Sequence, residues 1–153
     1  MRAAGETVVM FDGDEMRAVF GATKASSVNH GRPGRLALAM QYAKLCQLIA
    51  SQGVTVVCST ISMFEEVHSW NRSNQPDYFE VYLKVPLSEL RKRDPKGIYK
   101  RFDSGELSDV AGLDLQVDEP KSPDILFEFE PNLKLSEMTE KTLIKLNKGE
   151  RKL

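Results

Sequence analysis

The sequence has few of the residues that cross-link a chain or hold a metal ion. It contains two cysteines and two histidines among 153 residues. Cys46 and Cys58 lie inside apolar segments without CxxC spacing, and His30 and His68 have no partners at ligand spacing. We therefore expect two buried, reduced thiols, and neither a disulfide nor a zinc site.

Long hydrophobic runs and an excess of one charge are also missing. No apolar stretch approaches the ~18 residues that indicate a membrane span, and the N-terminus has no apolar signal core. The 21 Lys and Arg residues nearly balance the 22 Asp and Glu residues, which leaves a net charge of -1. This balance favours neither a nucleic acid nor a membrane as partner. The sequence predicts a cytoplasmic protein whose anion sites are local.

Apolar segments alternate with amphipathic ones along the chain. Short apolar runs predict strands at Val8–Asp12, Val54–Ser59, Tyr78–Val85 and Ile125–Phe129. Helical spacing predicts helices at Glu15–Phe20, Leu36–Ile49, Phe64–Ser73, Leu87–Arg93 and Leu135–Leu146. Strands that are apolar throughout and alternate with helices indicate the α/β class, with a parallel sheet covered by helices on both faces. We expect one domain over residues 1–146 and a charged tail over 147–153.

The first predicted strand ends on two carboxylates, at the edge where parallel α/β sheets bind ligands. Asp12 and Asp14 flank Gly13, and Arg17 follows on the first turn of the next predicted helix. Carboxylates in this position can hold a hydrated magnesium ion or accept a hydroxyl proton, while an arginine can bind a phosphate or sulfate. The alternative is a simple turn in which Asp14 caps the helix.

Further candidates follow the other predicted strands. Arg32 and Arg35 start the long helix, whose N-terminus favours an anion, although they could equally be solvated surface arginines. Ser62 could line a substrate pocket or simply cap the next helix. The cations of Arg93–Arg101 begin a Gly- and Pro-rich region, about residues 94–123, that could be a lid over a polyanion or a solvated loop.

Taken in order, these segments resemble the adenylylsulfate kinase family of P-loop kinases. The matching motifs are FDGDEMR for LDGDxxR, GVTVVCSTISMF for a strand and ISPY segment, YFEVYLKVPLSEL for FxEVYVxxPLxxx, RDPKGIYKR for RDPKGLYKK, and AGLDLQVDEPKSPD for TGxxxxYExPxxPD. The resemblance implies a P-loop NTPase-like fold. It also implies phosphorylation of the 3′-hydroxyl of adenylyl sulfate by ATP and Mg²⁺, a small-molecule nucleotide substrate and a homodimer.

The resemblance assigns roles to individual residues. The implied catalytic residues are Asp14, as proton acceptor, Asp12, beside magnesium, and Ser62, which matches a phosphoserine position of the family. The implied substrate-binding residues are Arg17, Arg32, Arg35, Ile61 and Lys96, and Arg93 is the implied ATP-binding residue. In the family, the segment that holds Arg93 and Lys96 closes over the phosphates.

The sequence departs from the family pattern around the acceptor. Arg35 stands where the motif DRxENIRR has an acceptor-binding asparagine, and Met63 stands in place of the proline of ISP. Two family motifs, FTG and PYE, become Val110-Ala111-Gly112 and Gln116-Val117-Asp118. Because members of this family also serve capsule polysaccharide pathways, another nucleotide such as cytidine diphosphoramidate is the alternative acceptor.

The phosphate loop of the family is the motif that the sequence lacks. No GxxxxGK[ST] string occurs between Met1 and Leu153. In the family this loop follows the first strand, and its amides and lysine cradle the ATP phosphates. The opening MRAAGE is typical of the end of the helix after that loop, so we expect the first strand and the loop to be missing. A third interpretation is a catalytically incompetent module that binds a nucleotide or a partner.

Overall fold

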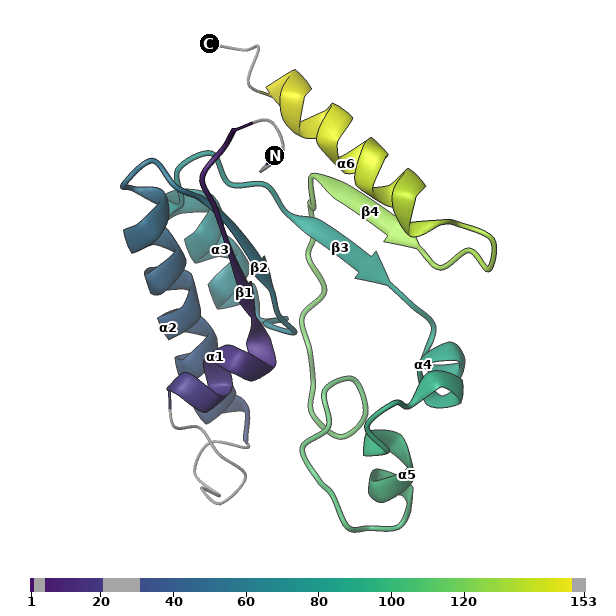
Figure 1. Cartoon of the computed structure of the whole chain (residues 1–153). Helices are drawn as coiled ribbons and strands as arrows, with labels where there is room; N and C mark the ends of the chain where they lie inside the picture. The colour runs from purple at the N-terminus through teal and green to yellow at the C-terminus, as the bar shows by residue number, and fades with distance from the viewer. Residues whose placement is uncertain (2–4, 21–30, 150–153) are drawn as a thin grey trace. The chain divides into compact units, whose positions relative to one another are not determined.

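The computed structural model describes Met1, residues 5–20 and residues 31–149 (Figure 1). In this part of the chain the elements are β1 (Val8–Asp12), α1 (Gly13–Val19), α2 (Arg32–Ala50), β2 (Thr55–Ser59), α3 (Glu65–Asn74), β3 (Val81–Lys84), α4 (Leu87–Arg93), α5 (Ile98–Asp103), β4 (Ile125–Glu128) and α6 (Leu135–Gly149). The predicted α/β class with parallel strands is confirmed. The prediction for His30 and most of that for the opening MRAAGE lie outside the described residues.

The chain divides into two compact units, each with its own pair of parallel strands. Residues 1–78 and 108–119 form the first unit, and residues 79–107 and 120–153 form the second. β1 pairs with β2 in the first unit, and β3 pairs with β4 in the second. No strand in the described ranges is hydrogen-bonded to both pairs, so the predicted sheet is present as two two-stranded sheets.

The core of the first unit lies between α2 and α3. Ala39 and Ala43 of α2 pack with Phe64 and Val67, and all four are buried. The spacing of Ala39 and Ala43 is part of the helical repeat that predicts α2. Because alanine side chains are small, α3 can approach α2 closely, and Trp70 packs at the border of this cluster.

The strands of the first unit are less covered than their apolar sequences predict. Met10 and Val57 are register partners, and both are exposed. Because alternate strand residues point to opposite faces, these two side chains share the face that the helices leave open. The prediction that Cys58 is buried is wrong, since β2 loses its cover towards its carboxyl end at Val57, Cys58 and Ser59. Cys46 is buried as predicted, and both cysteines are free thiols.

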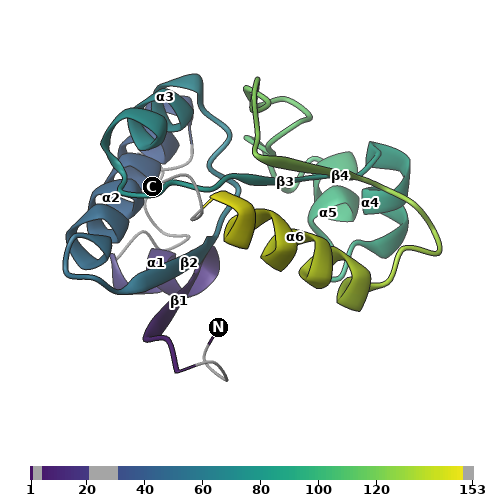
Figure 2. The ribbon, with the colours of Figure 1, turned by 90° about the horizontal axis from the view of Figure 1, so that it is seen from above.

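The second unit holds four of the predicted elements and one short helix that the sequence did not indicate. α5 lies inside the region predicted as a loop or lid. α6 runs beside β4 in Figures 1 and 2, and Lys145 Nζ donates to the Asp124 carbonyl. This helix continues to Gly149, three residues beyond its predicted end. No helix in the described ranges is long and apolar enough to cross a bilayer.

Candidate functional site

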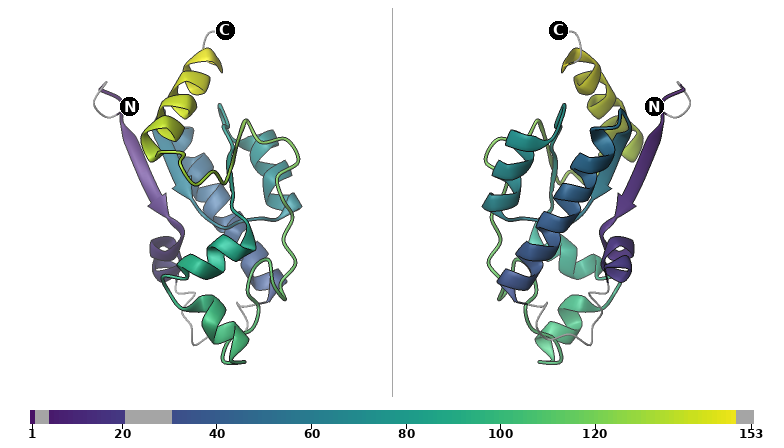
Figure 3. Two further views of the ribbon diagram at one scale, coloured as in Figure 1. Left: turned by 90° about the vertical axis from the view of Figure 1, so that its right-hand side faces the viewer. Right: turned by 90° about the vertical axis from the view of Figure 1, so that its left-hand side faces the viewer.

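The first candidate site lies where β1 and β2 end together. Asp12 is the register partner of Ser59, and α1 follows directly at this edge (Figure 3). Asp12 Oδ1 accepts hydrogen bonds from the amides of Asp14, at 2.9 Å, and Glu15, at 3.3 Å. The alternative prediction that Asp14 caps the helix is therefore wrong. Asp12 is the cap, and α1 starts two residues earlier than predicted.

Gly13 allows α1 to begin close against the end of β2. A Cβ atom at this position would lie 3.2 Å from the Ser59 carbonyl oxygen and 3.3 Å from Thr60 Cγ2. Both distances are shorter than ordinary van der Waals contact between such atoms. The absence of a side chain thus fixes where Asp12 and Asp14 lie relative to β2.

Asp12 retains an oxygen that suits a magnesium ion. Its Oδ1 is occupied by backbone amides, while Oδ2 accepts no hydrogen bond from the described residues. The described residues include no group of three or more His, Cys, Asp or Glu side chains that could hold a metal. Magnesium, however, keeps several waters and binds through one or two carboxylates together with substrate phosphates. A single available Asp12 oxygen fits that mode of binding.

The charge of Arg17, on α1, acts on Arg35, on α2. Arg17 lies in the last turn of α1 rather than in its first, because the helix begins at Gly13. Arg35 Nη2 donates to the Asp109 carbonyl at 2.6 Å, so Arg35 is not a simple solvated surface arginine. Burial, and then the nearby charge of Arg17, lower the pKa of Arg35.

Tyr42 is a neighbour of this pair that the sequence analysis missed. Its side chain is 5% exposed, and its ring centre lies 5.5 Å from that of Phe20 at the end of α1. Burial raises the pKa of the Tyr42 hydroxyl, the nearby Arg17 charge opposes this shift, and Cys58 and then Asp14 add to it. The position falls in the apolar stripe of α2, so no sequence signal separates it from ordinary core residues.

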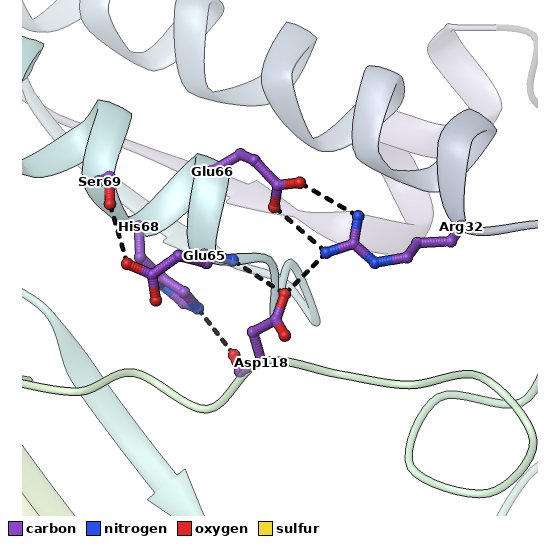
Figure 4. A network of polar contacts seen from close by, with 6 residues as sticks. All are labelled: Arg32, Glu65, Glu66, His68, Ser69 and Asp118. Atoms are coloured by element: carbon purple, nitrogen blue, oxygen red, sulfur yellow. Dashed lines mark hydrogen bonds and ion pairs between the residues drawn. The ribbon is translucent and has the colours of Figure 1, made fainter.

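Arg32 lies in a network of ion pairs (Figure 4). Its Nη1 and Nη2 donate to the two carboxylate oxygens of Glu66, at 3.2 and 3.3 Å, and Nη2 also donates to Asp118 Oδ2, at 2.8 Å. The guanidinium lies 5.3 Å from the ring centre of Phe64. Arg32 therefore links α2, α3 and the segment 108–119, and its side chain is 37% exposed. The role predicted for Arg32 stays a prediction.

Asp118 is the second residue that sequence reasoning missed. Its Oδ2 accepts the Glu65 amide at 3.1 Å, and its own amide donates to the Met63 carbonyl at 2.9 Å. The alternative prediction that Ser62 caps α3 is wrong, because Phe64 is the N-cap residue and makes no side-chain cap bond. A carboxylate 53 residues away in the sequence bonds the first amide of this helix instead.

Ile61 and Ser62 lie in the segment that joins β2 to α3. The Ile61 side chain is 77% exposed, which leaves it accessible to a ligand. The Ser62 carbonyl accepts the Phe64 amide at 3.0 Å and so forms the turn into α3. The roles predicted for these two residues stay predictions.

Arg93 and Lys96 belong to the second unit. Arg93 Nε donates to Glu89 Oε1 at 2.8 Å, and its guanidinium lies 5.1 Å from the ring centre of Phe129. Lys96 is exposed in the turn that leads to α5, where Gly97 has a positive φ of 63°. The motif that carries these cations is thus a helix start, and the roles predicted for Arg93 and Lys96 stay predictions.

Acid is expected to weaken the Arg32 network. The hydrogen bond from the Glu65 amide lowers the pKa of Asp118 below its ordinary 3.8. Burial opposes this shift, and Arg32 adds to it. Arg32 also lowers the pKa of Glu66 below its ordinary 4.5. Carboxylates with depressed folded-state pKa values stabilise the protein above the unfolded pKa, and that stability is lost as pH falls through the folded pKa. We expect the denaturant concentration that half-unfolds the first unit to decrease once the pH is lowered below about 4.

Asp118→Asn tests this dependence, because it removes one of the two titrating groups. Chemical denaturation followed by Trp70 fluorescence should show a lower midpoint at pH 7 for the variant and a shallower loss of stability between about pH 5 and 3. If the midpoint of the variant changes with pH as much as that of the wild type, Asp118 does not contribute to the loss of stability in acid.

The fold of the chain is similar to that of a solved kinase. The Mycobacterium tuberculosis APS kinase CysC, in complex with AMPPNP and APS, matches with a TM-score of 0.79 and 25% sequence identity. The match covers 95% of this chain and 83% of that one. Together with the carboxylates at the end of β1, this fold defines the class of α/β, P-loop NTPase-like proteins.

Sequence comparison narrows this class to one family. The sequence model for adenylylsulphate kinase matches residues 1–128, so the chain belongs to the adenylylsulphate kinase family. The cytidine diphosphoramidate kinase of Campylobacter jejuni is 33% identical over 117 residues, which are 76% of this chain and 66% of that protein. The probable adenylyl-sulfate kinase of Aeropyrum pernix is 29% identical over 136 residues, which are 86% of this chain and 72% of that protein. The chain thus spans about two thirds of the length of the first of these relatives.

Proposed function

We propose that the chain acts in ATP-dependent phosphorylation of a nucleotide, with the 3′-hydroxyl of adenylyl sulfate as the first candidate acceptor. The observation that carries this proposal is the family match over residues 1–128. It is supported by the position of Asp12, Asp14 and Arg17 at the carboxyl end of β1, where α/β proteins bind ligands.

The proposed reaction depends on positioning and charge stabilisation, as phosphoryl transfer generally does. The exposed Asp14 carboxylate accepts the proton of the acceptor hydroxyl. Asp12 would hold magnesium, and the ion would neutralise charge on the phosphate oxygens. Arg17 orients the anionic groups of the acceptor, and Ile61 contacts its base. Arg93 and Lys96 bind phosphates, as the family resemblance implies.

Cytidine diphosphoramidate is the second candidate acceptor. The relative from Campylobacter jejuni that carries this substrate in its name is 33% identical to this chain. The departures at Arg35 and Met63 fall among the residues that the family resemblance places at the acceptor. A change of acceptor would account for both departures.

A coupled ADP-release assay with each acceptor and MgATP tests the proposal. It is run on this chain and on a form extended upstream through any encoded GxxxxGK[ST], because the 153 residues contain no such string. We expect turnover with one acceptor at least tenfold above the other, since a site built around one set of polar groups rejects a ligand that leaves them unpaired. If both forms are folded and neither acceptor supports turnover, a nucleotide-binding or interaction module replaces the kinase proposal.

A further inference from the structure

The two cysteines of the chain contact each other across neighbouring elements of the first unit. Cys46 lies on the buried side of α2, and Cys58 lies on β2, the strand against which this helix packs. A hydrogen bond joins the two side chains, and both are free thiols. Because the sequence holds no other cysteine, each thiol has the other as its sole possible disulfide partner within the chain.

The two thiols differ in their access to solvent. Cys58 is exposed near the end of β2, where Val57 and Ser59 are exposed as well. Cys46 is 9% exposed and lies among the buried residues of α2. A dissolved oxidant therefore reaches Cys58 first, and Cys46 reacts with the group that is then attached to Cys58.

The end of β2 also leaves room for the movement that a disulfide needs. An S–S bond of about 2 Å is shorter than the contact between two hydrogen-bonded thiols, so the sulfurs must approach each other. Since the cover of β2 is lost from Val57 onwards, Cys58 can move towards α2 without displacing a packed core.

We infer that Cys46 and Cys58 form an intramolecular disulfide in the folded chain when it meets a low-molecular-weight disulfide such as oxidised glutathione. The Cys58 thiol loses its proton, attacks one sulfur of the oxidant and releases the first glutathione thiolate, which takes up a proton. The Cys46 thiol then does the same at the Cys58 sulfur and releases the second. Two protein thiols are oxidised to one disulfide, and the oxidant is reduced to two thiols.

This modification site adjoins the edge where β1 and β2 end together. Ser59, the residue after Cys58, is the register partner of Asp12, and its carbonyl oxygen lies close against Gly13. A bond that draws Cys58 towards α2 therefore shifts the segment against which Asp12 is positioned. We expect oxidation to lower kcat, an effect that rests on the proposed function. The formation of the bond does not rest on it.

Equilibration of the full chain in glutathione buffers tests the inference. The hydrogen bond with Cys46 raises the pKa of Cys58, which slows the first step, so the measurement is made at equilibrium rather than as a rate. After alkylation of the remaining thiols, intact mass spectrometry separates the dithiol, the mixed disulfide and the intramolecular disulfide. We expect the ratio of disulfide to dithiol to be about tenfold or more higher in the native chain than in urea, because the fold holds the two thiols in contact.

Two single variants separate the steps of the reaction. Cys46→Ala should stop at a mixed disulfide between Cys58 and glutathione. Cys58→Ser should stay unmodified while it is folded, since its remaining thiol is buried. In a form of the protein that phosphorylates a nucleotide, Cys58→Ser should also make kcat insensitive to oxidised glutathione.

Two results would overturn the inference. One is a native chain that keeps both thiols, or stops at the mixed disulfide, in buffers that oxidise the unfolded chain. The other is a disulfide between two chains in place of the intramolecular one. Equal kcat values before and after oxidation would refute the effect on the candidate site. An intramolecular disulfide in a chain that phosphorylates no nucleotide would instead leave the inference standing and refute the proposed function.

Discussion

Replacing Asp14 with asparagine is expected to lower kcat by about 100- to 10,000-fold in the form of the protein that phosphorylates a nucleotide. The substitution keeps the shape of the side chain and removes its ability to accept a proton. Asp14 is exposed in the first turn of α1, directly after the Asp12 cap, so the change leaves the helix start intact. The measurement is steady-state kinetics with MgATP and the acceptor that supports turnover.

Glu15→Gln is the matched control for Asp14→Asn. Glu15 is the next residue of α1, is also exposed, and loses the same charge in this variant. Its amide, which bonds Asp12 Oδ1, is unaffected. Control activity should remain within about twofold of the wild type, since exposed carboxylates away from the reacting atoms contribute little. An Asp14→Asn variant that is as active as this control would remove Asp14 from the reaction.

Replacing Phe64 with alanine is expected to lower the free energy of unfolding of the first unit by about 3–5 kcal/mol. Phe64 is 4% exposed and packs with Ala39, Ala43 and Val67. Its ring also lies under the Arg32 guanidinium, so the variant loses a cation–π contact as well as apolar burial. Because folded proteins are stable by only about 5–15 kcal/mol, this loss is large enough to leave much of the unit unfolded at 37 °C.

The single tryptophan of the sequence makes this effect measurable within the first unit. Trp70 packs against the cluster that contains Phe64, so its fluorescence reports the unfolding of that core. Leu48→Ala in α2 is the control, because Leu48 is 61% exposed and its truncation should change the unfolding free energy by about 0.5 kcal/mol or less. Equal unfolding curves for the two variants would show that the core does not depend on Phe64.

Periodicity in the sequence predicts the long elements of this fold because their burial follows a regular repeat. α2 carries Ala39, Ala43 and Cys46 at helical spacing, and the structure buries all three. α5 was missed for a physical reason. It has six residues, and it is started by the left-handed Gly97 and by Asp94, whose carboxylate accepts the amides of Tyr99 and Lys100. Such a short helix depends on local hydrogen bonds rather than on an apolar face.

In the candidate site, too, the sequence predicts the residues that are close together in the chain and misses partners that are distant in it. Asp12, Asp14 and Arg17 are close in the sequence, so one motif predicts them together. The partners of Arg32 cannot be found in this manner, because Glu66 is 34 residues away and Asp118 is 86 residues away. Tyr42 is hidden for another reason, since a buried tyrosine in an apolar stripe looks like ordinary core.

The proposed activity of this chain is phosphoryl transfer to a nucleotide at the end of β1. The most direct test follows the γ-phosphate of labelled ATP into adenylyl sulfate or cytidine diphosphoramidate, with the position of the label determined by ³¹P NMR of the product. We predict label on a ribose hydroxyl of one acceptor, and a loss of that product with Asp14→Asn but not with Glu15→Gln. Label that appears only as inorganic phosphate, from a folded protein that includes any phosphate loop encoded upstream, would contradict the claim.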